Sequence, residues 1–156
     1  MAIQVGQPAP DFTLFDSDKK QLTLSSLHGH YVVLLFFPLA FTGVCTKELC
    51  HVRDTISDYN KMDATVLGIS VDALQTLDRF KKDQGLNFTL LSDFNKDVSA
   101  LYGCLYETFA FNMKGVSKRS AFVIDKKGIV KYAEVLENAG ELPNFEAIEK
   151  TLATIA

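Results

Sequence analysis

Apolar and polar residues gather in separate blocks along this chain, and each block predicts one element of secondary structure. Residues 31–38 (YVVLLFFP) carry no charged side chain and are apolar throughout, which is typical of a strand buried on both faces. From Val44 to about Lys61, apolar residues recur at spacings of three and four, which predicts a helix. The mostly apolar block at 64–71 predicts a second buried strand. Strand, helix and strand in this order indicate parallel neighbours in one sheet.

The remaining blocks are shorter and complete the expected fold. Asp72 is predicted to cap a helix that ends at Gln84, and Pro143 is predicted to open a final helix. The other expected elements are strands at 12–15, 22–24, 88–91, 121–125 and 129–135 and a short helix at 95–102. The first two strands form a hairpin, and the last two are joined by a tight KKG turn. The order predicts an α/β fold: one domain over residues 1–156, with a central mixed sheet flanked by helices and an N-terminal β-hairpin.

Composition and charge exclude several classes of function. The 156 residues are 47% hydrophobic and 22% charged, with a net charge of −3, and no run of Lys and Arg is longer than two. We therefore expect no nucleic-acid partner. The longest apolar run, 31–40, is about half a membrane span and contains Pro38, so we expect no membrane segment. The N-terminus lacks the basic and apolar regions of a secretory signal, which favours a cytoplasmic protein.

Cys45 has the most informative position of the three cysteines. It follows a buried strand and a loop, and it lies in the first turn of the next predicted helix. Unpaired N–H groups and the helix dipole favour an anion there, so we expect the pKa of Cys45 to fall below about 8.5. Thr42 lies three residues earlier, close enough for its hydroxyl to contact the sulfur. Pro38 ends the strand and stiffens the loop. The alternative is that Cys45 is a small core residue.

The other reactive residue types do not form a recognisable metal or cofactor site. The chain contains three cysteines and three histidines but no CxxC or HxxxH spacing. Cys45 and Cys50 would point to different sides of one helix, which makes chelation by both poor, so no metal site is expected. His28 and His30 flank a glycine in a loop and are expected to be exposed. No P-loop and no GxGxxG motif occur, so no cofactor is predicted.

The loop before Cys45 resembles a known active-site motif. Residues 38–45 (PLAFTGVC) fit the P-x-x-x-T-x-x-C motif of the peroxiredoxins. APDFTL near the start and the segments 67–70 (LGIS), 86–93 (LNFTLLSD) and 119–125 (RSAFVID) are similar to peroxiredoxin segments in their usual order. The resemblance implies a thioredoxin-like fold. It also implies reduction of hydrogen peroxide and organic hydroperoxides by a cysteine, with no metal or flavin.

The resemblance also implies a role for each matching residue. Cys45 is the nucleophile, and Thr42 donates and accepts hydrogen bonds around the peroxide oxygens. Pro38 shields the pocket. Arg119 stabilises the thiolate and the polarised O–O bond, and Glu48 orients that arginine. Such donors can follow the charge as it moves along the S–O–O line. The alternatives are a surface salt bridge for Arg119 and an ordinary helix acid for Glu48.

Two branches of the family compete. FFPLAFTG and the chain length resemble alkyl hydroperoxide reductase E, whose members use one catalytic cysteine. The segment 45–50 (CTKELC), followed by Arg53 and Asp54, resembles the peroxiredoxin Q branch, in which a resolving cysteine follows five residues after the first. In an ideal helix residues five apart have Cα atoms ~8–9 Å apart, whereas a disulfide needs less than about 7 Å. An intrasubunit disulfide with Cys50 therefore requires unwinding around 42–51.

The function expected from these residues is thiol-specific peroxide reduction through a sulfenic acid at Cys45, resolved by Cys50. The alternatives are a one-cysteine peroxidase recycled by an external thiol and a non-catalytic redox sensor or holdase. Thioredoxin, glutaredoxin or a mycothiol-type thiol is the expected reductant. Cys104 is interpreted as structural, with a resolving role as the alternative. The aromatic stretch 106–113 either covers the active site or forms a subunit interface, and a homodimer is expected.

Overall fold

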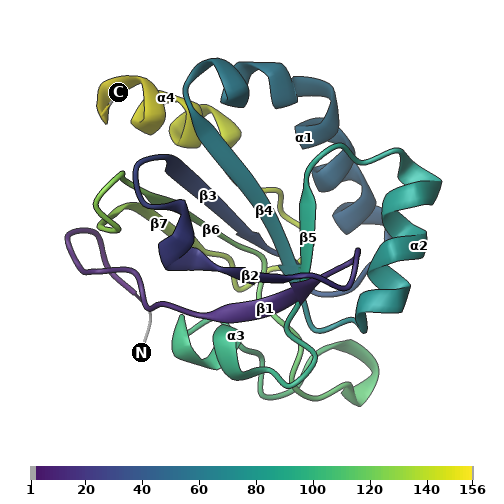
Figure 1. Ribbon diagram of the computed structural model, residues 1–156. Coiled ribbons are helices and arrows are strands. Elements are labelled where there is room, and N and C mark those ends of the chain that lie inside the picture. The colour runs from purple at the N-terminus through teal and green to yellow at the C-terminus, as the bar shows by residue number, and fades with distance from the viewer. Residues whose placement is uncertain (1–2, 156) are drawn as a thin grey trace.

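Within residues 3–155, which the computed structural model describes, seven strands form one mixed sheet in the order β2-β1-β5-β4-β3-β6-β7 (Figure 1). The strands are β1 (Thr13–Asp16), β2 (Gln21–Thr23), β3 (Tyr31–Phe36), β4 (Ala64–Ser70), β5 (Thr89–Ser92), β6 (Ser120–Ile124) and β7 (Val130–Val135). The helices are α1 (Gly43–Lys61), α2 (Leu74–Gln84), α3 (Asp97–Leu101) and α4 (Phe145–Ile155), with short 3-10 turns at Leu24–Leu27 and Ala110–Asn112. The thioredoxin-like α/β class predicted from the sequence is confirmed.

The centre of the sheet is parallel and both of its margins are antiparallel. β3 pairs with β4 and β4 with β5 in parallel, because α1 and α2 carry the chain back across one face. β6 runs antiparallel to β3 and β7 antiparallel to β6. The predicted N-terminal hairpin forms, and β1 joins it to the sheet by pairing antiparallel with β5. The sheet is therefore mixed, as expected.

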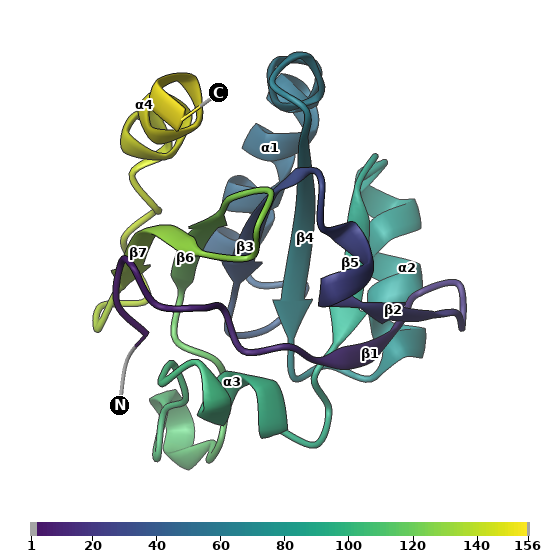
Figure 2. The ribbon, with the colours of Figure 1, turned by 60° about the vertical axis from the view of Figure 1, so that its left-hand side comes forward.

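Alternate side chains of β3 enter two separate cores. Val33 and Leu35 belong to the core under α1, α2 and α4, whereas Val32, Leu34 and Phe36 pack on the other face with the N-terminal segment and α3. Figure 2 shows α3 lying away from α1, α2 and α4. All six β3 side chains are buried, so the strand needs no polar face, and this explains its unbroken apolar sequence.

Element ends differ from the predicted ones in ways that bear on the site. β3 ends at Phe36, two residues before Pro38, and α1 begins at Gly43. Asp72 does not cap α2, contrary to the sequence-based expectation, because the cap position belongs to Ala73 and no side chain bonds the first turn. Its carboxylate is directed to the active-site loop instead. The last helix begins after Pro143, where Asn144 Oδ1 accepts the N–H of Ala147 at 3.0 Å.

None of the helices in residues 3–155 is long and apolar enough to span a bilayer.

Candidate active site

The site lies where β3 ends and α1 begins. Pro38 is buried two residues after the end of the strand, in the loop that leads into the helix. Phe41 has a φ of 65°, a left-handed conformation that a bulky residue rarely adopts, and its ring packs edge-on against Phe80 at 5.0 Å. Asp72 Oδ2 accepts the backbone N–H of Ala40 at 2.8 Å. These contacts hold a strained loop in one shape, which fixes where the helix starts.

Cys45 and Arg119 meet inside a shallow pocket. Cys45 is 1% exposed in the first turn of α1, and Arg119 Nη2 donates to its Sγ at 3.3 Å. The pocket has a volume of about 270 Å³, and Pro38, Thr42 and Phe109 also line it. Arg119 immediately precedes β6, which pairs with β3, so the sheet itself brings two residues 74 positions apart into contact.

Arg119 is held on three sides. Its Nη1 donates to Glu48 Oε1 at 2.5 Å, and its Nε and Nη2 donate to the carbonyl of Ala139 at 3.3 and 3.0 Å. Burial lowers the pKa of Arg119, but the charges of Glu48 and Cys45 more than offset this, and the pKa is raised. The guanidinium is therefore a fixed positive charge beside the sulfur. The surface salt bridge considered for Arg119 does not describe this buried residue.

Glu48 lies one turn along α1 from Cys45 and has no access to water. Its side chain is 0% exposed, and Oε2 is a buried oxygen with no hydrogen-bond partner in the described part of the chain. Burial raises the pKa of Glu48 to about 7; Arg119 opposes this shift, and the charge of Glu134 adds to it. The ordinary, exposed helix acid considered for Glu48 would show none of these features. Because its pKa is about 7, Glu48 gains or loses its charge close to neutral pH.

Thr42 borders the pocket but does not contact the sulfur by a hydrogen bond. Its hydroxyl donates to the carbonyl of Leu39 at 2.7 Å, and the residue stands at the N-cap position of α1. The hydroxyl proton is used within the loop, so the oxygen can act toward other groups only as an acceptor through its lone pairs. Thr42 is therefore placed to receive a hydrogen bond from a molecule that enters the pocket.

The other two cysteines lie outside the pocket, and all three are free thiols. Cys50 is half-buried on α1, and its Sγ donates to Gln84 Oε1 at 3.5 Å. Cys104 is 0% exposed, and burial raises the pKa of its thiol to about 12. A protonated, inaccessible thiol fits the structural interpretation of Cys104.

Two positions at the site were not found from the sequence: Asp72 and the loop at Ala139. Phe109 lines the pocket, in agreement with one of the two alternatives given for the stretch 106–113. A signal existed for the loop at Ala139. The β6–β7 hairpin reverses at 125–128, so its register returns the chain to Arg119, where Leu136 N donates to the Arg119 carbonyl at 2.9 Å. The residues that follow Leu136, including Ala139, then lie near the Arg119 side chain. Pairing the residues on the two sides of the hairpin turn would have located them.

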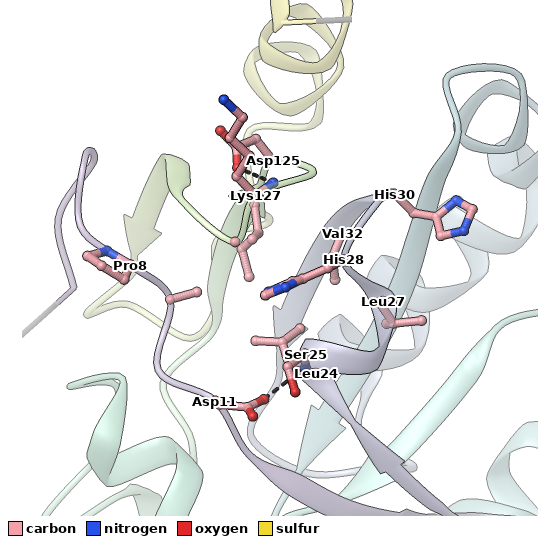
Figure 3. Close-up of a pocket in the computed structure, with 13 residues that line it drawn as sticks. Pro8, Asp11, Leu24, Ser25, Leu27, His28, His30, Val32, Asp125 and Lys127 are labelled. Carbon is pink, nitrogen blue, oxygen red and sulfur yellow. Dashed lines mark hydrogen bonds between the residues drawn. The ribbon is translucent and has the colours of Figure 1, made fainter.

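A second cavity of about 290 Å³ lies beside the start of β3, at the opposite end of this strand from the active-site loop (Figure 3). Its carboxylates are engaged by the backbone: Asp11 accepts the N–H of Ser25 at 2.8 Å, and Asp125 bonds the turn that follows it. His28 and His30 border it and are exposed, as expected. No thiol lines this cavity. Among the described residues, no group of three or more His, Cys, Asp or Glu side chains forms a metal-binding cluster.

The arrangement around Cys45 suits a nucleophilic thiolate. A helix N-terminus and a fixed guanidinium both present positive charge or N–H donors to the same small volume. Such a site both stabilises the attacking sulfur and binds the oxygens of a bond under attack. Fold and site together define a thiol-based redox protein.

Comparisons with known proteins agree with that class. Residues 5–133 match the AhpC/TSA family. Alkyl hydroperoxide reductase E of Mycobacterium tuberculosis is 39% identical over 156 residues, covering 98% of each chain. A Coxiella burnetii protein named as the peroxiredoxin bcp is 41% identical over 132 residues, covering 83% of this chain and 87% of that protein. The crystal structure of the peroxidoxin BcpB from Mycobacterium tuberculosis has a TM-score of 0.87 at 30% identity and covers 99% of each chain.

This chain belongs to the AhpC/TSA family. The resemblance to the peroxiredoxins is thereby confirmed, together with the predicted enzyme class of thiol peroxidase. The relatives include both branches that the sequence suggested, alkyl hydroperoxide reductase E and bcp.

Proposed function

We propose that this chain reduces hydrogen peroxide and organic hydroperoxides with Cys45 as the nucleophile. The observation that carries the proposal is the 3.3 Å contact between Arg119 Nη2 and Cys45 Sγ at the floor of a pocket that opens to solvent. The Cys45 thiolate attacks one peroxide oxygen, so that an S–O bond forms while the O–O bond breaks. The other oxygen leaves as hydroxide or alkoxide and takes up a proton to become water or an alcohol. Cys45 is left as a sulfenic acid.

Each neighbour of Cys45 has a role in that step. Arg119 neutralises the thiolate and follows the negative charge toward the leaving oxygen. Thr42 accepts the peroxide O–H with its free lone pairs, and Pro38 keeps water from the sulfur. Glu48 and the Ala139 carbonyl hold the guanidinium in place. Fixed donors of this kind stabilise the transition state without reorganising as the charge moves.

We propose that Cys50 then resolves the sulfenic acid as an intrasubunit disulfide. The five-residue spacing and the half-exposed thiol support this assignment, and thioredoxin, glutaredoxin or a mycothiol-type thiol would reduce the product in the cytoplasm. The intact helix at 43–61 opposes it, because Cys45 points into the pocket while Cys50 contacts Gln84 on another side. The first turns of α1 must unwind. A one-cysteine peroxidase recycled by an external thiol and a redox sensor or holdase are the competing functions.

Mass spectrometry after one equivalent of hydrogen peroxide tests these assignments. We expect a disulfide between Cys45 and Cys50 in the wild type, a sulfenic acid at Cys45 in Cys50→Ser, and no peroxide consumption by Cys45→Ser. Many turnovers with thioredoxin indicate an enzyme, whereas one turnover without recycling indicates a sensor. Peroxide consumption by Cys45→Ser would refute the nucleophile. Equal recycling of wild type and Cys50→Ser would make Cys50 a packing residue.

We further propose a homodimer that forms beside the pocket. Two exposed aromatic side chains stand on the loops that border it: Phe41, which is 50% exposed, and Phe111, which is 94% exposed. Phe111 also has a φ of 57°, so its loop holds an apolar ring out toward solvent at a cost in backbone strain. Sedimentation should give a mass near twice 17.3 kDa. A mass that stays at the monomer value at every concentration would contradict the dimer.

A further inference from the structure

The half of α1 that carries Cys50 is tied to the end of α2. Arg53 Nη1 donates to the main-chain carbonyl of Gln84 at 2.6 Å, and Asn87 Nδ2 donates to the carbonyl of Arg53 at 3.2 Å. The same Gln84 accepts the Cys50 thiol through its side-chain Oε1. Gln84 is the last residue of α2, so its carbonyl has no partner within the helix and needs one from outside.

These contacts bring the Arg53 guanidinium and the Cys50 thiol to the same residue of α2, Gln84. Arg53 follows Cys50 by three residues, and side chains at that spacing lie on one face of a helix. The hydrogen bond that Arg53 donates to Asp54 raises the pKa of Arg53, and the charge of Cys50 raises it further. Asp54 Oδ1 fixes the guanidinium through its Nε at 2.9 Å. From α2, the group that contacts the thiol is the uncharged amide of Gln84.

We propose that Arg53 is a positioning residue for the resolving step: it anchors Cys50 and stabilises the Cys50 thiolate that attacks the sulfenic acid of Cys45. This inference rests on the proposed function. The Cys50 sulfur forms the S–S bond, the S–O bond of Cys45 breaks, and the leaving hydroxide takes the proton that Cys50 released, giving water. No further oxidant is required. Gln84 holds the thiol in the resting enzyme, and Arg53 stabilises it once the proton leaves.

The anchor also determines which cysteine moves. Arg53 and Asn87 fasten α1 just after Cys50, whereas Cys45 lies in the first turn and is joined to the loop before it. Unwinding therefore affects the turns before Cys50, and the oxidised Cys45 travels to a thiol that stays in place. Cys50 stays in place and does not enter the Cys45 pocket, so the guanidinium of that pocket cannot stabilise its thiolate. A charge near Cys50 itself is therefore needed.

Quenched-flow mass spectrometry over a range of pH tests this role. One equivalent of hydrogen peroxide is added to the wild type, Arg53→Gln, Arg53→Lys and Arg79→Gln, and the loss of sulfenic acid and the gain of disulfide are followed. Arg79→Gln is the matched control, because Arg79 is an exposed arginine of α2 that pairs with Asp83 at 2.9 Å and does not contact Cys50. Oxidation of Cys45 in the same samples reports whether the fold is intact.

We expect Arg53→Gln to form the disulfide about fivefold more slowly near neutral pH, with the midpoint of its pH profile moved upward and the difference disappearing at high pH. Arg53→Lys should recover most of the rate, and Arg79→Gln should match the wild type. Equal slowing at every pH would show that Arg53 is only structural and would overturn the inference, as would an unchanged profile. Both results would leave the peroxidase proposal standing. A wild type that oxidises Cys45 but never forms the disulfide would overturn both the resolving role of Cys50 and this inference.

Discussion

Asp72 Oδ2 accepts the backbone N–H of Ala40 at 2.8 Å, which ties the end of β4 to the loop that precedes Cys45. The same oxygen accepts the Ser70 hydroxyl at 2.7 Å, and Ser92 donates to the Asp72 carbonyl at 2.6 Å. Three strand ends therefore share one polar cluster beneath the loop. The carboxylate takes no part in the chemistry, yet it limits where Thr42 and the start of α1 can lie.

Asp72→Ala should consequently loosen the active-site loop. It leaves the Ala40 N–H and the Ser70 hydroxyl without an acceptor, which costs about 1–3 kcal/mol in unfolding free energy. We expect the oxidation of Cys45 to slow by roughly tenfold, because the donors are no longer held in register with the sulfur. Urea denaturation and single-turnover kinetics measure the two effects. Asp72→Asn keeps one oxygen acceptor, so its unfolding free energy and its oxidation rate should lie between those of the wild type and Asp72→Ala. A wild-type oxidation rate in Asp72→Ala would exclude a positioning role.

Arg119→Ala removes the charge nearest to the sulfur. Loss of one such donor typically slows catalysis by about 10²–10³-fold, and we expect that range for oxidation of Cys45 by hydrogen peroxide. Lys118→Ala is the neighbouring control, since Lys118 pairs with the exposed Glu137 at 2.7 Å and does not line the pocket. Circular dichroism checks that both variants are folded. A change of less than about threefold in Arg119→Ala would contradict the assignment.

Glu48 should make stability depend on pH in an unusual direction. Burial raises its pKa from 4.5 to about 7, so between these values the folded protein keeps a proton that the unfolded chain has lost. The stability linked to this proton is complete below pH 4.5 and is lost as the pH rises to about 7. Glu48→Gln removes the titration. The unfolding free energy of the wild type, measured relative to this variant, should therefore fall as the pH increases through that window. A difference that rises with pH would mean that the folded protein binds the charged carboxylate in preference.

Cys104 should resist alkylation in the folded protein. Its thiol is 0% exposed, and burial raises its pKa to about 12, so at mildly alkaline pH it is protonated and out of reach. Iodoacetamide should label Cys50 in the native, reduced protein while Cys104 stays unlabelled, as read by peptide mass spectrometry. Denatured protein, in which all three cysteines react, provides the reference. Labelling of Cys104 at the rate of Cys50 would contradict the structural interpretation.

The sequence predicted the elements well wherever a single hydrophobic periodicity runs through the whole element. The buried strand at Tyr31 and the helix that carries Cys45 were found within two residues of their observed ends, because each has a single periodicity. Asp72 was misassigned because an acid before a helix has the same local signature whether it bonds the helix or a loop distant in sequence. Only the parallel pairing of β3 with β4 brings Ala40 within its reach.

The candidate site likewise contains residues that a local pattern predicts and residues that only the strand pairing brings together. Cys45, Thr42 and Pro38 are close in sequence, and a local motif is sufficient to predict that they lie together. Arg119 was predicted from family resemblance, and its contact with Cys45 depends on the pairing of β6 with β3. The Ala139 carbonyl has no side-chain signature at all, since any residue supplies a backbone oxygen. Its place was encoded in the register of the β6–β7 hairpin rather than in the identity of the residue.

The two thiols of α1 occupy independent environments. Cys45 and its partner Arg119 are buried, whereas Cys50 is half-exposed and contacts α2. Exchanging the side chain at position 50 therefore leaves the packing around the nucleophile untouched. Peroxide reduction and the choice of recycling partner can then diverge separately during evolution. Under the resolving role proposed for Cys50, one half-buried position on α1 is the point at which protein engineering would convert a self-resolving peroxidase into one that depends on an outside thiol.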